Sequence, residues 1–240
     1  ASLAGIARIE DLKASPSYEA YSKKPFYEEY DPNSEYFFKF EGFKWNEVHK
    51  SVLVWALGHP ESEPVLDWWS MKVPGFTPGN RVMRAQSRTL RAWLAEELGI
   101  KGLSLPYQIE FGGTFLKDSA HLAGLGVIGR NNLLVTPEFG TQVRLRGMFI
   151  EAELTPTGPL YFTPCEGCDR PCHRACPRDA YRSGSYERAL CKLENDKRDS
   201  EPIMVEGAIM GIDESCEVIK PCRYCELACP VAQGDLGRVS

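Results

Sequence analysis

The hydrophobic pattern of the chain predicts strands and helices that alternate over its first two thirds. Residues 51–57 (SVLVWAL) form a continuous apolar run that ends at a Gly-His-Pro sequence. Its length and its β-branched residues predict a buried strand. We also predict strands at residues 102–106, 133–136 and 142–150, with a turn at residues 137–140 between the last two.

The clearest predicted helix spans residues 81–98, where Asn80 can cap the first turn and Gly99 can end the last one. We expect further helices at residues 61–71 and 116–125, and short helices and loops over residues 1–45. Four arginines fall on one stripe of the long helix, which indicates either a solvated face or a contact for anionic ligand groups: Arg81, Arg84, Arg88 and Arg91.

This mixture of elements predicts an α/β (α+β) fold. The cysteines divide the chain, because all nine lie between Cys165 and Cys229 and none precedes them. Residues 155–164 are rich in proline, threonine and glycine, as linkers are. We therefore predict one domain over residues 1–158 and a second over residues 159–240.

Composition and charge narrow the classes of function. Hydrophobic residues make up 43% of the chain and charged residues 25%, which is typical of a globular protein. The net charge of −5 argues against a general nucleic-acid binder, which needs a basic surface. No apolar run approaches the roughly 20 residues of a membrane-spanning helix, and no signal peptide is recognisable. We expect no membrane span and a cytoplasmic location.

The cysteines form two motifs that indicate iron–sulfur clusters, since thiolates are soft, anionic ligands. The first is Cys165-x2-Cys168-x3-Cys172-x3-Cys176-Pro177, and the second is Cys222-x2-Cys225-x3-Cys229-Pro230. Zinc prefers pairs of ligands, and an odd number of clustered cysteines does not suit a disulfide framework. Both remain as alternatives at this point. We expect two clusters, both of the [4Fe–4S] type.

In two-cluster ferredoxins the cysteine that precedes proline binds the other cluster. The first cluster would then have four ligands: Cys165, Cys168, Cys172 and Cys229. The second would have Cys176, Cys222, Cys225 and one more cysteine. Cys191 and Cys216 compete for that place, and we favour Cys191, because a helical stretch after Cys176 can return it to the cluster. The three-residue spacing before Cys172 departs from the two-residue spacing of bacterial ferredoxins.

Residues 123–140 (AGLGVIGRNNLLVTPEFG), followed by Val-Arg-Leu at 143–145, are more specific than any periodicity. Together with the two cysteine motifs, they resemble the superfamily of cobalamin-dependent epoxyqueuosine reductases and reductive dehalogenases, over roughly residues 105–230. The resemblance implies a nitroreductase-like domain that binds a corrinoid, followed by a ferredoxin-like module with two clusters.

The resemblance also implies roles for individual residues. It assigns corrinoid binding to Gly124, Gly126, Ile128, Gly129, Arg130 and Asn131, and glycines there would let the backbone approach a flat macrocycle closely. A tight helix-to-strand turn without a ligand is the alternative. Glu110 or Tyr107 would supply a proton, and Arg144 would lie beside the substrate or the proton donor. A surface Glu110, a packed Tyr107 and a strand-face Arg144 are the alternatives.

The function that follows from the resemblance is that of a cobalamin-dependent iron–sulfur reductase. Electrons would pass through the clusters to cobalamin and reduce it to cob(I)alamin, for reductive chemistry on a small substrate or for corrinoid processing. A corrinoid reductase or delivery protein without its own substrate, and a plain electron carrier, are the alternatives. Expected partners are an electron donor such as ferredoxin or flavodoxin and, in the delivery role, a corrinoid protein. We do not expect tRNA as a partner.

Overall fold

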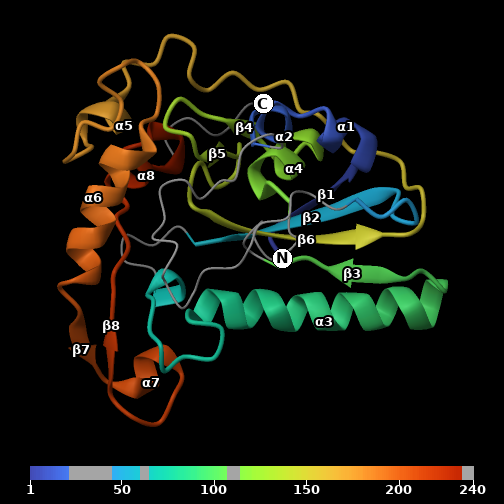
Figure 1. Cartoon of the computed structure of the whole chain (residues 1–240), viewed down its shortest axis with the longest axis horizontal. Helices are drawn as coiled ribbons and strands as arrows, with labels where there is room; N and C mark the ends of the chain where they lie inside the picture. The colour runs from blue at the N-terminus through green and yellow to red at the C-terminus, as the bar shows by residue number, and fades with distance from the viewer. Residues whose placement is uncertain (22–44, 60–64, 107–113, 234–240) are drawn as a thin grey trace. The chain divides into compact units, whose positions relative to one another are not determined.

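The computed structural model describes residues 1–21, 45–59, 65–106 and 114–233 of the chain (Figure 1). The chain divides into two compact units, each made of three stretches. The sheet unit comprises Ala1–Ala56, Ser87–Leu125 and Leu145–Tyr161. The cysteine unit comprises Leu57–Gln86, Gly126–Arg144 and Phe162–Ser240. The predicted two-domain division at residues 158 and 159 falls close to the last change between units and stays a prediction.

A four-stranded sheet, in the order β1-β2-β6-β3, forms the centre of the sheet unit. Its strands are β1 (Leu3–Arg8), β2 (Ser51–Gly58), β3 (Gly102–Ser104) and β6 (Val143–Ile150). Strand β1 pairs antiparallel with β2, with Leu3 opposite Ala56, and β3 pairs antiparallel with β6, with Gly102 opposite Ile150. The strands predicted over residues 51–57, 102–106 and 142–150 are thus confirmed.

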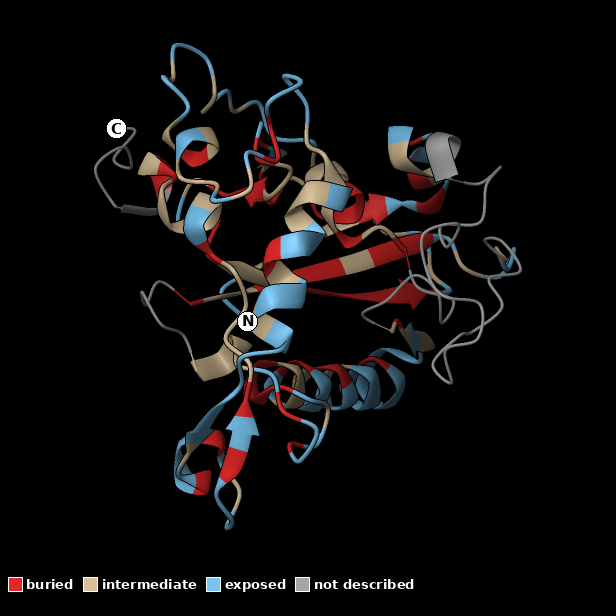
Figure 2. Ribbon diagram, turned by 60° about the vertical axis from the view of Figure 1, so that its left-hand side comes forward, coloured by how far each residue is buried: buried red, intermediate tan, exposed pale blue. Residues whose placement is uncertain are grey.

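Helices cover both faces of this sheet. Helices α1 (Ile9–Lys13) and α4 (Leu116–Leu122) pack with β1, whereas the C-terminal part of α3 (Pro78–Leu98) runs beside β3 on the other side (Figure 1). Helix α2 (Pro16–Tyr21) follows α1. Because both faces are covered, β2 is buried along most of its length (Figure 2). This burial explains why its sequence is a continuous apolar run and does not alternate.

Strand β1 was not predicted, because residues 1–45 were expected to form only helices and loops. The strand contains Ala4, Gly5 and Ala7, small residues with weak strand preference. Because these residues are small, β1 can pack closely against the segment that follows α4. A Cβ atom added to Gly5 would lie only 2.3 Å from the carbonyl oxygen of Ala123. The close approach of two backbones therefore selects for small residues that hide the strand from a sequence pattern.

Helix α3 begins earlier than predicted, and Asn80 is not its cap. The helix starts at Pro78, and the hydroxyl oxygen of Thr77 accepts a hydrogen bond from the Asn80 backbone N–H at 3.0 Å. Thr77 therefore caps the helix, because its hydroxyl accepts from a backbone N–H of the first turn that has no partner within the helix. Proline is well suited to the first helical position, where its missing N–H is not needed. The predicted end is confirmed, since Gly99 has a left-handed φ of 64°.

Two predicted elements differ from the structure. Within the predicted helix at 61–71, the described residues form only a 3-10 helix, η1 (Val65–Asp67), after which Trp69 pairs with Ile219. Residues 60–64 lie outside the described ranges. Tertiary pairing of the backbone therefore overrides the local helical pattern. The strand predicted at 133–136 is the short β5 (Leu134–Val135), which pairs with β4 (Val127–Ile128) and not with β6.

The cysteine unit consists of short elements. After β4 and β5 come α5 (Pro171–Arg174), α6 (Arg188–Asp199), β7 (Ile203–Val205), α7 (Gly207–Met210), β8 (Cys216–Val218), α8 (Tyr224–Leu227) and η3 (Pro230–Gln233). One of its apolar cores contains Val73, Met210, Cys216 and Val218, with Trp68 packed against it. Within the described ranges, the helices are too short or too polar to cross a membrane.

Candidate functional site

The first four predicted cluster ligands lie close together in the cysteine unit. Cys165 and Cys168 lie on the loop before α5, Cys172 lies in α5, and Cys229 follows α8, which packs against α5. Burial raises the pKa of Cys172, and the charges of Cys229, Cys165 and Cys168 raise it further. Such interactions require each of the other three thiols to lie within electrostatic reach of Cys172. We call them the first thiol group.

A second thiol group consists of Cys176, Cys191, Cys222 and Cys225. Burial raises the pKa of Cys225 to about 11, although its hydrogen bond with Tyr181 acts in the opposite direction. The charges of Cys222, Cys191 and Cys176 raise this pKa further. Cys176 lies on the turn after α5, Cys191 lies in α6, Cys222 lies just before α8 and Cys225 lies in α8. Elements distant in sequence therefore bring both thiol groups together.

Cys191 and Cys216, the two competitors for the last ligand position, lie in different surroundings. Cys216 is fully buried in the apolar core formed by Val73, Met210 and Val218. Cys191 lies on α6, where its sulfur accepts a hydrogen bond of 3.9 Å from the Asn195 side chain. A single helical stretch was expected between Cys176 and Cys191. In the structure, turns follow Cys176, and the helix that carries Cys191, α6, begins only at Arg188.

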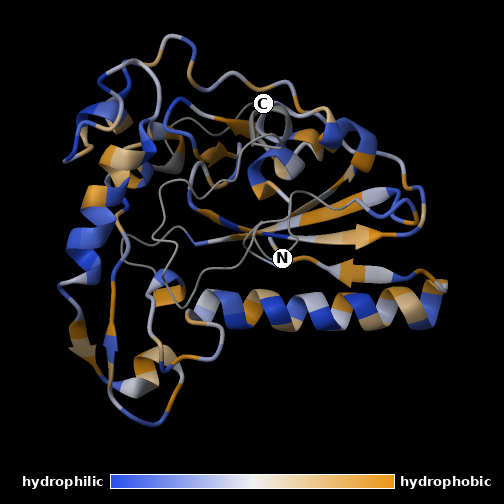
Figure 3. Cartoon of the chain, viewed as in Figure 1, coloured by the Kyte–Doolittle hydropathy of each residue, from blue (hydrophilic) through white to orange (hydrophobic). Residues whose placement is uncertain are grey.

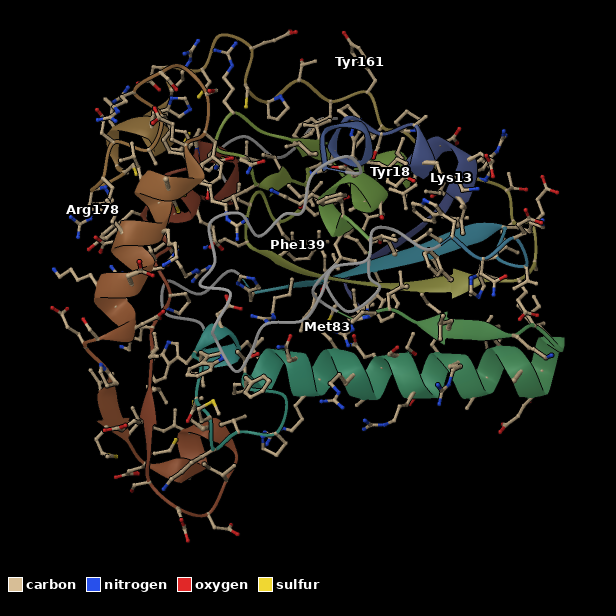
Figure 4. The ribbon with its side chains drawn as sticks, in the orientation of Figure 1. Lys13, Tyr18, Met83, Phe139, Tyr161 and Arg178 are labelled. Carbon is tan, nitrogen blue, oxygen red and sulfur yellow. The ribbon has the colours of Figure 1, made fainter. Side chains whose placement is uncertain are left out.

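Helix α6 is hydrophilic along most of its length (Figure 3), and ion pairs hold it in place. Glu194, one turn after Cys191, is only 7% exposed. It accepts hydrogen bonds from Arg178 at 3.1 Å and from Arg198 at 3.3 Å. Figure 4 labels Arg178 beside this helix. The spacing of Cys191, Glu194 and Arg198 places all three on one helix face, so the ion pairs orient the cysteine.

Aromatic side chains connect the two thiol groups. His173, the neighbour of Cys172, stacks on Tyr181 with ring centres 4.3 Å apart, and Tyr186 packs on the other side of that pair. Burial raises the pKa of Tyr181 and of Tyr186, and hydrogen bonds to Cys225 and Cys191 respectively raise both further. Both hydroxyls therefore keep their protons, and the Tyr181 hydroxyl donates to the Asn131 carbonyl oxygen at 3.1 Å.

The donor chemistry of both thiol groups fits [4Fe–4S] clusters, each of which takes four cysteine thiolates. The raised pKa values of Cys172 and Cys225 mean that cluster binding must displace protons from these thiols. Across the part of the chain that is described, three or more His, Cys, Asp or Glu side chains do not converge to hold one single metal ion.

The glycines predicted to face a corrinoid make room for the protein itself. Gly124 has a φ of 78°, and an added Cβ atom would lie 3.0 Å from the Cα of Gly158. At Gly126 such an atom would lie 2.2 Å from the carbonyl oxygen of Val135, and at Gly129 it would lie 2.7 Å from the Val135 side chain. These glycines therefore fit the alternative of a tight turn and do not by themselves form a corrinoid site.

The other predicted corrinoid residues differ in exposure. Asn131 is 4% exposed, and its side chain donates to the Cys225 carbonyl oxygen at 3.3 Å and accepts from the Leu133 N–H at 3.3 Å. It therefore holds the β4–β5 segment against the second thiol group. Ile128 is 40% exposed and Arg130 is also exposed. Their role in corrinoid binding stays a prediction.

Replacing Gly126 with alanine distinguishes the two explanations of that glycine. We expect Gly126→Ala to lower the free energy of unfolding by about 3 kcal/mol, because backbone atoms must move to accept the Cβ atom. Gly99→Ala is the matched control, since nothing lies within 4 Å of its added atom, and it should cost only about 1 kcal/mol for its left-handed backbone. Urea unfolding measures both. Unchanged stability of Gly126→Ala would instead favour a ligand-facing glycine.

Arg144 lies at the start of β6 and is held by other protein groups. Its guanidinium forms an ion pair with Asp67, and it donates to the Thr77 hydroxyl at 3.2 Å and to the Asn80 side-chain oxygen at 3.0 Å. The Arg144 and Asp67 side chains are 13% and 11% exposed. Gly79 leaves the space for this side chain, because its added Cβ would lie 2.7 Å from Arg144 Cδ. The predicted place of Arg144 beside a substrate stays a prediction.

The ion pair extends to the segment that carries three cysteines. His59 Nδ1 lies 3.5 Å from Asp67 Oδ2 and 3.2 Å from Arg223 Nη2, and Arg223 in turn donates to Glu226 at 2.5 and 3.0 Å. The side chains of His59 and Arg223 are 3% and 8% exposed. We call these five residues the buried charge network: His59, Asp67, Arg144, Arg223 and Glu226. The sequence pattern did not indicate it, because its members come from four separate segments.

The two predicted proton donors, Tyr107 and Glu110, lie outside the described residues.

The four arginines on the stripe of α3 differ in their contacts. Arg81 donates to the backbone oxygen of Gly211 at 2.9 Å, so it serves packing within the cysteine unit. Arg84, Arg88 and Arg91 are exposed, as the solvated-face interpretation predicts.

No protein-family model matches the chain, but individual relatives do. Epoxyqueuosine reductase of Bacillus cereus is 26% identical over 155 residues, which cover 64% of this chain and 38% of that protein. Tetrachloroethene reductive dehalogenase of Sulfurospirillum multivorans is 41% identical over 64 residues, which cover 26% of this chain and 13% of that protein.

Solved structures of both kinds are also similar. An epoxyqueuosine reductase with an epoxyqueuosine-modified tRNA-Tyr stem loop has a TM-score of 0.61 and 17% identity, over 100% of this chain and 64% of that one. A catabolic reductive dehalogenase in complex with 3-bromo-4-hydroxybenzoic acid has a TM-score of 0.50 and 16% identity, over 77% of this chain and 26% of that one.

The chain is thus similar, in sequence and in fold, to epoxyqueuosine reductases and reductive dehalogenases. The predicted resemblance to this superfamily is therefore confirmed, and so is the predicted mixed α/β fold, whose sheet is antiparallel in its described pairings. The chain spans 38% or less of the length of these curated relatives. The expectation that tRNA is no partner is not supported, because one similar structure holds a tRNA stem loop.

Proposed function

We propose that the chain is an iron–sulfur reductase that passes electrons through two [4Fe–4S] clusters to a bound corrinoid. The observation that carries this proposal is the pair of thiol groups within one unit, each with four cysteines. The first thiol group would hold one cluster, and the second would hold the other, so that Cys191 is a ligand and Cys216 is the spare cysteine. The cysteine unit would then act as a ferredoxin-like module of a nitroreductase-like protein.

The residues around the thiol groups would prepare them for electron transfer. The Tyr181 hydroxyl donates to the Asn131 carbonyl oxygen at 3.1 Å, and the Ala180 N–H donates to Cys176 Sγ at 3.3 Å. Hydrogen bonds to sulfur stabilise the more negative, reduced state of a cluster. The stacked rings of His173 and Tyr181 lie between residues of the two groups. An external carrier, such as ferredoxin or flavodoxin, would supply the electrons.

A corrinoid is proposed on the similarity of fold, and Gly124, Gly126 and Gly129 add no support for it. When bound, it would supply a cobalt ion that accepts the electrons and acts on a small substrate or is itself processed. Ile128 and Arg130 are the residues of the predicted set that are exposed and could contact it. Glu110 or Tyr107 would supply the proton that a reductive reaction consumes.

Anaerobic purification followed by metal analysis and cobalamin titration tests this proposal. We expect about eight iron and eight sulfide per chain, since each cubane contains four of each. We also expect cobalamin to bind and its visible absorption to change when the protein is reduced. Cluster content without any cobalamin binding would contradict the reductase proposal and favour a plain electron carrier. Cobalt reduction that reactivates a corrinoid protein without any substrate turnover would favour the delivery role.

A further inference from the structure

One nitrogen atom in the buried charge network has two neighbours with opposite requirements. His59 Nδ1 lies 3.2 Å from Arg223 Nη2 and 3.5 Å from Asp67 Oδ2. A guanidinium only donates hydrogen bonds, so its contact needs a lone pair on Nδ1; a carboxylate only accepts them, so its contact needs a proton there. With its proton on Nε2, a neutral His59 would accept from Arg223, whereas a cationic His59 would donate from Nδ1 to Asp67.

The charges around His59 are balanced when this histidine is neutral. Among the described residues, the charged groups that face it are Asp67 from η1 and Arg223, with Glu226 paired to Arg223 and Arg144 paired to Asp67. The His59 backbone N–H is bound separately, by the Gln142 carbonyl oxygen at 3.0 Å. Two cations and two anions leave the network without net charge. A negative charge added nearby would favour a proton on His59, because opposite charges favour the charged form.

The proposed reduction of a cluster adds such a charge beside the network. Arg223 lies between Cys222 and Cys225, and Glu226 lies between Cys225 and Cys229. The same short segment therefore carries one end of the buried charge network and ligands of both proposed clusters. Arg223 itself is only 8% exposed, which weakens the screening by water between its charge and a charge on the neighbouring cysteines. Oxidation of the cluster reverses the change, and Arg223 again donates to His59.

We propose that His59 couples proton uptake to reduction of the cluster held by Cys222 and Cys225. For each electron taken from an external one-electron donor, His59 Nδ1 takes one proton from solvent and donates it in a hydrogen bond to Asp67. No heavy-atom bond forms or breaks, and the charge of cluster and network together stays constant. His59 acts through Arg223 and is thus a positioning residue. This inference rests on the proposed function, since it needs the clusters.

The pH dependence of the cluster potential tests this inference. Reconstituted protein is titrated with dithionite at several values between about pH 5 and 8, where histidine changes charge, and the reduced clusters are quantified by electron paramagnetic resonance. Because electron and proton enter together, the midpoint potential should fall as pH rises. The slope should reach up to about 59 mV per pH unit, which corresponds to a tenfold change in the equilibrium constant for one electron.

His59→Gln is the decisive variant, because the glutamine oxygen can accept from Arg223 but cannot take a proton. We expect it to retain its iron and to lose the pH dependence of the potential. His121→Gln, which changes a histidine of α4 in the sheet unit, should keep the wild-type slope. Asp67→Asn provides a second route, since it removes the negative charge that favours protonated His59 and should lower the slope.

The outcomes separate this inference from the proposed function. A wild-type potential that does not change with pH overturns the inference while leaving the clusters and the proposed function intact. An undiminished slope in His59→Gln also overturns it, and so does an undiminished slope in Asp67→Asn if the first variant fails to fold. A protein that shows no cluster signal under any condition defeats the proposed function, and the inference with it.

Discussion

Replacing Cys191 with alanine is expected to lower the bound iron from about eight to about four atoms per chain, because each [4Fe–4S] cluster depends on four thiolates. Cys191 contributes to the raised pKa values of both Cys222 and Cys225, which requires it to be near them. Its loss would leave the second thiol group with three ligands. Iron and sulfide analysis of anaerobically reconstituted protein, together with the absorption near 400 nm (roughly the thiolate-to-iron band), measures the effect.

Cys216→Ala is the matched control for this experiment. It removes a cysteine that is buried among Val73, Met210 and Val218, away from the thiol groups. We expect unchanged iron and a loss of about 1 kcal/mol in stability, the amount expected for one buried heavy atom. The reverse result, with iron lost in Cys216→Ala and retained in Cys191→Ala, would exchange the roles of the two cysteines.

Replacing Asp67 with alanine is expected to lower the free energy of unfolding by about 3–5 kcal/mol. The substitution leaves Arg144, whose side chain is 13% exposed, without its anion, and a charge that is largely removed from water and unpaired is costly. Arg144 also lies at the N-terminal turn of α3, where the helix dipole disfavours a cation. Asp67 therefore offsets both the removal of the Arg144 charge from water and its unfavourable interaction with the helix dipole. Chemical unfolding monitored by circular dichroism measures the loss.

The double variant Asp67→Ala/Arg144→Ala should lose less stability than the sum of the two single variants, because it leaves no unpaired charge. The exposed pair Lys192–Asp196 provides a control, with side chains 45% and 48% exposed. Asp196→Ala should cost only about 0.2–0.5 kcal/mol. Equal small losses in Asp67→Ala and Asp196→Ala would show that the network contributes nothing to stability.

The parts of the fold that depend on local chemistry could be predicted from the sequence. The apolar run that becomes β2 and the glycine that ends α3 act within a few residues, so their patterns are visible in one segment. The spacing of the cysteines, read with the two-cluster ferredoxin pattern, also suggested two ligand sets, which stay a prediction. Cysteine has few structural uses at such spacings, and the residue type itself therefore carried much of the information.

Features that depend on distant segments could not be predicted. His59, Asp67 and Arg223 carry no motif, and only the folded chain brings them together. Gly126 is an example of a glycine whose role was misjudged from the sequence. It was expected to face a macrocycle, whereas the nearest group to an added Cβ atom is the backbone of Val135. A sequence records that a side chain is absent but not which group occupies the space.

The short segment from Cys222 to Cys229 has a consequence for biosynthesis. It supplies the proposed ligands that complete both thiol groups, although the first of these groups begins at Cys165. During translation, neither group would have its full set of thiolates until this segment has left the ribosome. Iron insertion would therefore be a late event that acts on a nearly finished polypeptide. A chain released early, before Cys222, would hold neither cluster and would expose reactive thiols to oxygen.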